Sequence, residues 1–281
     1  MTLQSPLWRM FHHAADSTPH DYTYKPASKN CNVHNGQQKL LRAEQEFLLR
    51  HLPQLDIKPG GVVVVYAGAA PGTHIVQLIT QFPHVRFALY DTADFDRHLH
   101  RICDSDDSRV YLCNSLFTDD DAQAWSSCGM SVLFISDIRS TVHDKRMHYS
   151  VESKQEDDTR VEIGIARDME DQARWVHLMQ PQGALLKFRP PYWYDWAIEN
   201  NEIWTYLPGN IMLPCHGPPH TSECRLDVDV AAALYGQKTT LCTKHYQDVM
   251  AFFNSQWRPA YDQDVDKYVT DLLRSYMAMN C

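Results

Sequence analysis

The sequence predicts an α/β fold in which a mainly parallel, doubly wound sheet is flanked by helices. Two observations indicate this fold. Apolar, β-branched runs alternate along the chain with segments of helical periodicity, and a polar residue follows directly after several of these runs. The 281 residues are 44% hydrophobic and 22% charged, which is enough apolar material for a sizeable core.

The chain begins with a polar segment that contrasts with the rest. Residues 1–35 are rich in proline and histidine, and we expect them to form an N-terminal arm with little regular structure. Residues 36–281 are expected to form a single domain. Its first element is a helix over 37–52, where leucines recur at helical spacing until Pro53 ends the pattern.

The clearest strand comes next. Residues 61–66 (GVVVVY) form a β-branched run typical of a strand buried on both faces. The small-residue turn 67–72 (AGAAPG) follows, and Thr73 is suited to cap a helix behind it. A second strand is expected over 85–90 and ends at Asp91.

The remaining elements follow the same alternation. Further strands are expected over 109–113, 131–136, 184–188, 203–207 and 224–230, and helices over 161–179 and 262–279. The mixed-charge segment 140–160 has no apolar period, so we expect a long loop inserted in the domain there. Long loops in compact domains are often functional.

Composition excludes several classes of protein. The formal charge of −9 disfavours nonspecific coating of nucleic acid. The 8 cysteines are scattered without C-x-x-C spacing, so neither a zinc site nor a disulfide framework is expected, and we predict no metal. No apolar run has the roughly 20 residues that a membrane span needs, and residues 1–16 lack the apolar centre of a signal peptide. We therefore expect a cytoplasmic protein with reduced thiols.

The turn after the first strand predicts a ligand-binding corner. A helix N-terminus behind a glycine turn presents unpaired N–H groups. Asp91 ends the second strand 23 residues after Gly68, close to the offset at which an acid meets ribose hydroxyls. The turn lacks the three glycines of a dinucleotide fingerprint, so S-adenosylmethionine fits better than NAD. A glycine that only permits tight packing of strand on helix is the alternative.

Four charged residues are expected at the same end of the sheet. They are Lys39 in the first helix, Asp137 after a strand, Lys187 near the end of another strand, and Glu223 at the start of a later strand. Charged groups beside apolar strand ends are costly unless they are paired. Structural ion pairs would explain them as well as catalysis would.

Methyl transfer to a ribose hydroxyl would give the four residues a common purpose. The hydroxyl is a poor nucleophile, so a base must remove its proton as it attacks the methyl carbon. A lysine amine can be that base when a neighbouring cation and partial burial lower its pKa. Lys39 could supply the cation, with Asp137 and Glu223 holding both ammonium groups in place.

Six ordered motifs give the chain a family resemblance. GQQKLL, VVYAGAAPGTHI, LYD, ISDIRS, LLKFRPP and TSECRL, between about residues 36 and 230, resemble those of the poxvirus cap-specific mRNA (nucleoside-2′-O-)methyltransferases, which are also poly(A) polymerase regulatory subunits. The resemblance implies a Rossmann-like, S-adenosylmethionine-dependent methyltransferase fold. It also implies transfer to the ribose 2′-hydroxyl of the first transcribed nucleotide of capped mRNA. The four charged residues also belong to a wider group of RNA ribose methyltransferases.

The resemblance implies roles for individual residues. Lys187 becomes the proton acceptor, and Lys39, Asp137 and Glu223 complete a tetrad. The implied cofactor contacts are Gln37, Tyr66, Gly68, Pro71, Gly72, Asp91 and, through the backbone, a residue near Phe117. Ala93 stands where the family has an arginine.

A cap pocket is implied by the aromatic segment 190–196 (PPYWYDW). Aromatic planes can sandwich a cationic methylated guanine, although such residues can equally pack as a core or surface cluster. The family pattern places the aromatic at Tyr192 or Trp193, the acid at Asp195, the arm tyrosine at Tyr24 or else Tyr22, and a later glutamate at Gln247. Arg189, Thr221 and Ser222 would contact the first transcribed nucleotides.

The implied partners are capped mRNA and a poly(A) polymerase catalytic subunit. A large DNA virus is the implied source, which would place the protein in the host cytoplasm or the virion. Two alternatives remain. One is an RNA-binding processivity subunit of the polymerase, and the other is a 2′-O-methyltransferase acting on ribosomal or transfer RNA.

Overall fold

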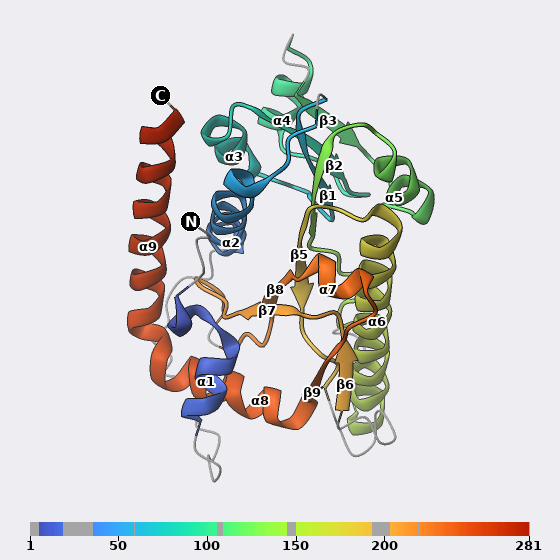
Figure 1. Ribbon diagram of the computed structural model, residues 1–281. Helices are drawn as coiled ribbons and strands as arrows, with labels where there is room; N and C mark the ends of the chain where they lie inside the picture. Colours follow the sequence, from blue (N-terminus) through green and yellow to red (C-terminus); the bar gives the residue numbers. More distant parts are fainter. Residues whose placement is uncertain are drawn as a thin grey trace.

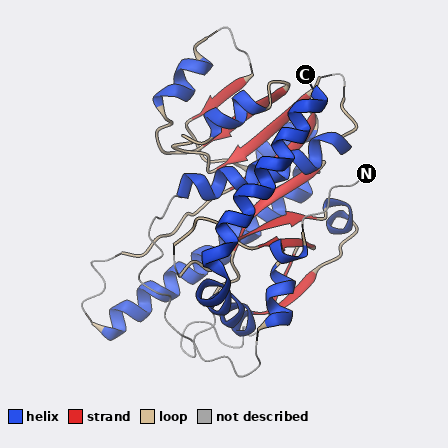
Figure 2. Ribbon diagram, turned by 90° about the vertical axis from the view of Figure 1, so that its left-hand side faces the viewer, coloured by secondary structure: helices blue, strands red, loops and turns tan. Residues whose placement is uncertain are grey.

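The computed structural model describes residues 6–18, 36–58, 60–105, 109–144, 150–192, 203–218 and 220–280. A central sheet with helices on both faces dominates the molecule (Figure 1). In Figure 2, where the side carrying α9 (Arg258–Asn280) faces the viewer, the helix that ends at the C-terminus crosses in front of the strands.

The sheet has the doubly wound topology expected. Its order is β3-β2-β1-β4-β5-β8-β7. The strands are β1 (Val62–Ala67), β2 (Val85–Tyr90), β3 (Val110–Cys113), β4 (Ser131–Ser136), β5 (Gly183–Phe188), β7 (Gly209–Met212) and β8 (Cys224–Val228). The first five in this order pair in parallel, and β8 runs antiparallel to both of its neighbours. The α/β fold class is confirmed, and the strand order is that of a Rossmann-like methyltransferase.

The central strands follow the apolar runs of the sequence. Every residue of β1 and β4 is buried, as the continuous β-branched composition of a strand covered on both faces predicts. The expected strand over 203–207 forms instead a separate two-stranded sheet, in which β6 (Ile203–Tyr206) pairs with β9 (Thr239–Cys242).

Helices cover both faces of the sheet. On one side lie α2 (Gly36–His51), α3 (Ile75–Gln81) and α9, and on the other lie α5 (Asp119–Ser126) and α6 (Val151–Met179) (Figure 1). The remaining helical segments are α4 (Arg97–Cys103), α7 (Val230–Leu234), α8 (Thr243–Phe252), the π-helical turn η4 (Phe253–Trp257) and the short 3-10 turn η2 (Leu52–Gln54). No helix within the described ranges combines the length and apolar character needed to span a membrane.

The expectation of a loop over 140–160 is wrong in its second half. Helix α6 begins at Val151, where Ser150 and Ser153 form a reciprocal capping box. The buried residues of this part of α6 are Ser153 and Asp157, about one helical turn apart. Because the buried positions are polar, the segment has no apolar period. Hydrophobic periodicity therefore could not predict this part of the helix.

The N-terminal arm is also more ordered than expected. The short turn η1 (Leu7–Arg9) leads into α1 (Phe11–Ser17), and Phe11 stacks on Tyr246 with ring centroids 4.9 Å apart. Arg9 is buried, and its Nε donates to Glu46 over 2.9 Å. These partners lie far away in sequence, so local composition could not reveal them. Residues 19–35 lie outside the described ranges.

Candidate active site

The candidate site lies at the edge of the sheet where the carboxyl ends of the parallel strands meet. Strand β1 pairs with β2 on one side and β4 on the other, so the strand order reverses at this point. Ligands of open α/β sheets bind at such a switch point. Because β8 is antiparallel, its first residue lies at this same edge, as does the N-terminal end of α2, the helix that precedes β1.

The glycine turn after β1 packs directly against the loop after β4. Gly68 has φ +81°, and a Cβ placed on it would lie 2.8 Å from Ile138 N and 2.9 Å from Asp137 C. Gly72 has φ +69°, and a Cβ there would lie 2.8 Å from Leu99 Cδ1. Both positions therefore require glycine for conformation and for space.

Asp91 organises this turn. Its Oδ2 accepts from the Ala70 backbone N over 2.9 Å, and its Oδ1 accepts from Ala93 N over 2.9 Å. The carboxylate is thereby fixed at the end of β2, beside the glycine turn. The exposed Pro71 follows a cis peptide bond in the same turn.

Gln37 reaches the same turn from the start of α2. Its Oε1 accepts from Thr73 Oγ1 over 2.6 Å and faces His74 Nδ1 at 2.8 Å. The expectation that Thr73 caps the following helix is wrong. The residue at the N-cap of α3 is His74, and Thr73 donates its hydroxyl to Gln37 instead.

Two of the expected cofactor residues have side chains in the core. Tyr66 is 1% exposed and donates its hydroxyl to Glu44 Oε1 over 2.7 Å. Phe117 packs its ring edge-on against Tyr90 and Trp175, with centroids 5.0 Å away in each case. A contact with a cofactor at these two positions would therefore come from the backbone.

The four charged residues of the tetrad converge. Lys187 Nζ lies 3.1 Å from Asp137 Oδ1 and 3.6 Å from Glu223 Oε2. Lys39 Nζ donates to Glu223 Oε1 over 2.5 Å. Both lysine side chains are mostly buried, with 11% of Lys187 and 13% of Lys39 exposed. Residues that lie up to 184 positions apart in sequence thus form one ionic cluster.

Two arginines join the cluster that the sequence analysis did not single out. Arg225 Nη2 donates to Asp137 Oδ1 over 2.6 Å, and Arg139 Nη2 donates to Glu223 Oε2 over 3.2 Å. A signal was present in the sequence, because each arginine follows a tetrad acid by two positions and so lies on the same side of an extended segment.

The cations keep both carboxylates ionised. Burial alone would raise the pKa of Asp137, but Arg225 and then Lys187 lower it below its usual value. Burial would likewise raise the pKa of Glu223, but Lys187, Lys39 and Arg225 bring it well below its usual value. The same carboxylates raise the pKa of the Arg225 guanidinium against the effect of its burial.

Side chains of helices anchor the segments that carry Lys187 and Glu223 through hydrogen bonds to their backbone carbonyls. Gln172 of α6 donates from Nε2 to the Lys187 carbonyl over 3.2 Å. Asn254 Nδ2 donates to the Thr221 carbonyl over 2.8 Å, and the Tyr246 hydroxyl donates to the Ser222 carbonyl over 2.6 Å. The main chain leading to Glu223 is therefore anchored to the C-terminal helices.

Arg189 does not extend into solvent, contrary to the expected contact with a transcript. Its guanidinium makes a two-pronged ion pair with Glu162, at 2.9 and 3.0 Å, and is buried. It also covers one face of the Tyr192 ring, with Cζ 4.1 Å from the ring centroid. The Tyr192 hydroxyl donates to Ser222 Oγ. Arg189 thus acts within the structure, positioning Tyr192 beside the segment before β8.

The other cap-pocket residues are placed only in part. Tyr22, Tyr24, Trp193 and Asp195 lie outside the described residues. Gln247 lies half-buried on α8, next to Tyr246.

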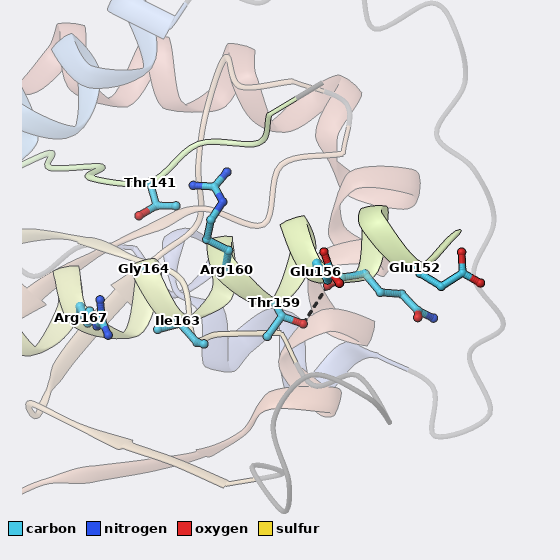
Figure 3. A pocket seen from close by; sticks show the side chains of 9 residues that line it. Thr141, Glu152, Glu156, Thr159, Arg160, Ile163, Gly164 and Arg167 are labelled. Carbon is cyan, nitrogen blue, oxygen red and sulfur yellow. Dashed lines mark hydrogen bonds between the residues drawn. The ribbon is translucent and has the colours of Figure 1, made fainter. Parts of the chain in front are cut away.

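A groove of about 660 Å³ runs along the first half of α6, starting at Thr141 (Figure 3). Glu152, Glu156, Arg160 and Arg167 line it, and Figure 3 shows that all four belong to this helix. None of the tetrad residues lines the groove. Two carboxylates are followed along the helix by two guanidinium groups, so the formal charges that line the groove cancel.

The fold and the site place the protein in a class. The strand order, the glycine turn at the switch point and the acid at the end of β2 define a methyltransferase fold of the Rossmann-like type. A sequence model of the family described as "Poly A polymerase regulatory subunit" matches residues 2–281. The chain therefore belongs to that family.

Individual proteins also resemble this chain. Proteins of two strains of Myxoma virus, Lausanne and Uriarra, are each described as a cap-specific mRNA (nucleoside-2′-O-)-methyltransferase. Each is 27% identical over 227 residues, which cover 75% of this chain and 58% of the relative. The match thus spans little more than half the length of these relatives. An O-methyltransferase family protein from Burkholderia thailandensis is 14% identical with a TM-score of 0.23, over 57% of this chain and 44% of that chain.

Proposed function

We propose that this protein transfers a methyl group from S-adenosylmethionine to the ribose 2′-hydroxyl of the first transcribed nucleotide of capped mRNA. The observation that carries the proposal is the position of the Lys187 amine. It lies between Asp137 and Glu223, in a cluster whose Asp137 loop touches the Gly68 turn. The proposed base, Lys187, is thus adjacent to the glycine turn that would bind the cofactor, as methyl transfer between two bound molecules requires.

The residues of the corner fit the cofactor. S-Adenosylmethionine, when bound, supplies an electrophilic methyl group on a sulfonium. Gly68 and Gly72 let the turn pack closely on neighbouring protein atoms, and Asp91 can accept from ribose hydroxyls with the lone pairs that the turn does not use. Gln37 would contact the amino-acid part. The backbone at Tyr66, Pro71 and near Phe117 would complete the contacts.

In this mechanism, Lys187 removes the proton of the 2′-hydroxyl as the oxygen attacks. Among the described residues, Lys39, Lys187, Arg139 and Arg225 share Asp137, Glu223 and Asp168, which leaves the cluster one positive charge in excess. Arginine keeps its proton in proteins, so the base among these four cations must be a lysine. Asp137 and Glu223 hold the amine where the hydroxyl must lie.

A cap pocket would lie beyond β5 and β8. Tyr192, whose ring lies against Arg189, is the described aromatic candidate for stacking on a methylated guanine. Tyr22, Tyr24, Trp193, Asp195 and Gln247 are the further candidates. We assign Thr221 and Ser222 to the first transcribed nucleotides. Family membership and the viral relatives support a place in the host cytoplasm.

The experiment is transfer of a labelled methyl group to transcripts of one sequence, capped and uncapped, followed by nuclease mapping. We expect label on the ribose of the first transcribed nucleotide of the capped transcript. Label on an internal nucleotide, or on a base, would overturn the proposed site of methylation. Equal rates with both transcripts would refute the cap pocket and favour ribosomal or transfer RNA.

A second function is favoured by the family match over residues 2–281. We propose that the protein also acts as a regulatory subunit of a poly(A) polymerase. A pull-down with a polymerase catalytic subunit and a tail-length assay test this role. We expect retention of the polymerase and longer tails in the presence of this chain, and unchanged tails would refute the role.

A further inference from the structure

Four polar side chains form a continuous chain of hydrogen bonds beneath the candidate cofactor corner. Gln37 Oε1 lies 2.8 Å from His74 Nδ1, and His74 Nε2 lies 2.9 Å from Glu44 Oε2. Tyr66 donates to the other oxygen of Glu44 over 2.7 Å. His74, Glu44 and Tyr66 are each at most 4% exposed. None of the three has a role in proton transfer at Lys187.

The hydrogen bonds define the orientation of the Gln37 amide. Its Oε1 is approached by three groups, which are the Thr73 hydroxyl at 2.6 Å, the His74 backbone N–H at 3.3 Å and His74 Nδ1. The backbone N–H can only donate. A flipped amide would point its own N–H groups at this donor, so the oxygen must occupy this place.

The same argument assigns the proton on Nδ1 of His74. Nδ1 faces the oxygen of Gln37 and must donate, whereas Nε2 lies 2.9 Å from Oε2 of Glu44. Burial and the neighbouring Glu44 raise the pKa of Tyr66, so its hydroxyl stays protonated and donates to the other oxygen of Glu44. Contacts at both ring nitrogens therefore fix the orientation of the His74 ring.

We propose that His74 is a positioning residue that fixes the Gln37 amide so that its NH₂ group is offered to the carboxylate of the bound methionine moiety. The inference rests on the proposed function, because it concerns the same cofactor. With Oε1 occupied by three donors, the NH₂ group is the part of this amide that a ligand can use. A carboxylate accepts such hydrogen bonds. The adenosine part of the ligand is assigned to Asp91, so the amino-acid part is left for Gln37.

The test compares two ligands that share adenosine and sulfur. S-Adenosylhomocysteine carries the amino-acid carboxylate, and 5′-methylthioadenosine lacks it. We expect His74→Phe to weaken binding of S-adenosylhomocysteine about tenfold and to leave 5′-methylthioadenosine unchanged, since only the first ligand has the carboxylate that the Gln37 amide would bind. His177→Phe, in an exposed histidine of α6, is the control and should change neither affinity.

A double variant separates positioning from general damage to the fold. If His74 acts through Gln37, then Gln37→Leu and His74→Phe together should weaken S-adenosylhomocysteine no more than Gln37→Leu alone. Additive losses, or equal losses for both ligands, would overturn the inference. A wild-type protein that binds neither ligand would refute the proposed function itself.

Nitrogen NMR of the imidazole gives a readout independent of ligand. We expect Nδ1 of His74 to carry a proton in the unliganded wild type, because it faces the oxygen of Gln37. A ring whose Nδ1 carries no proton would contradict the assignment.

Discussion

Gly68 and Asp137 touch backbone to backbone, so that a Cβ on the glycine would lie 2.9 Å from the carbonyl carbon of Asp137. The Asp137 backbone N also donates to the carbonyl of Ala67 over 2.9 Å. The turn that would hold the cofactor and the loop that carries a tetrad acid are therefore one packed unit. A displacement of either segment must move the other.

The first prediction tests this contact. Gly68→Ala should lower the free energy of unfolding more than Gly236→Ala, which shares a positive φ of +79° but has no atom within 4 Å of the added Cβ. Backbone strain costs each variant about 1–2 kcal/mol, and only Gly68→Ala adds a steric clash. Urea unfolding measures both, and titration with S-adenosylhomocysteine should show weaker binding for Gly68→Ala alone. Equal losses of stability would show that the close approach is unimportant.

The second prediction concerns Lys187. Lys187→Met should reduce methyl transfer to capped RNA by at least about 10²-fold, because general bases contribute about 10²–10⁴-fold. Binding of S-adenosylhomocysteine should stay within about twofold, since the amine is assigned to the hydroxyl and not to the cofactor. Lys267→Met, at an exposed position of α9, is the matched control. Substantial turnover by Lys187→Met would remove the lysine from the mechanism.

The third prediction concerns Arg225, which donates to Asp137 and was not singled out from the sequence. Arg225→Met should lower kcat about tenfold to a hundredfold, because a charge-assisted hydrogen bond is lost. The pKa of Asp137 should rise once this cation is removed, so the acid limb of the pH–rate profile should move to higher pH. Partial recovery in Arg225→Lys would support the role of the charge. An unchanged acid limb would argue against it.

A fourth prediction follows from the lowered pKa of Glu223. In the folded state this pKa lies well below 4.5, and in the unfolded chain it returns to that value. The stabilisation is therefore complete above about pH 4.5 and is lost as the pH falls through the folded-state pKa. Glu223→Gln does not titrate, so the wild type's advantage over this variant in unfolding free energy should shrink on acidification. Urea unfolding at several pH values checks this, and an advantage that grew would have the wrong sign.

The fifth prediction compares a buried ion pair with an exposed one. Arg189→Met leaves Glu162 without its ion-pair partner, and the two side chains of this pair are only 10% and 3% exposed. The variant should lower the free energy of unfolding by about 3–5 kcal/mol. Arg274→Met removes the ion pair with Asp271, in which the two side chains are 77% and 56% exposed. It should lower the free energy of unfolding by less than about 1 kcal/mol. Urea unfolding gives both values. A small loss of stability in Arg189→Met would mean that water reaches and hydrates the Glu162 carboxylate in the variant.

Much of the site was predictable because most of its residues lie at the ends of strands, and the strands have a clear apolar pattern. The runs that became β1, β4 and β5 have apolar centres, so the polar residues at or just after their carboxyl ends could be assigned to one edge of a parallel sheet. Lys187, Asp137 and Glu223 meet there as expected. Their catalytic roles and the cap pocket remain predictions.

Helix α6 shows why other features escaped prediction. Its buried face presents Asp157, Glu162 and Asp168 to the segments after β4 and β5. A buried carboxylate looks like an exposed one in the sequence, since its burial depends on a partner supplied by another element. Residues 151–160 therefore resembled a solvated loop, and Arg189 resembled an RNA contact.

The amino-acid sequence by itself determined the α/β class, the glycine turn and the strand ends where charge collects, because these follow from local periodicity and from residues with special backbone freedom. Only the tertiary structure decided which charges pair: Arg189 with Glu162, Arg225 with Asp137, and His74 with Glu44. The physical reason is that apolar burial leaves a pattern in neighbouring residues, whereas a buried ion pair joins groups whose distance along the chain carries no information about their distance in space.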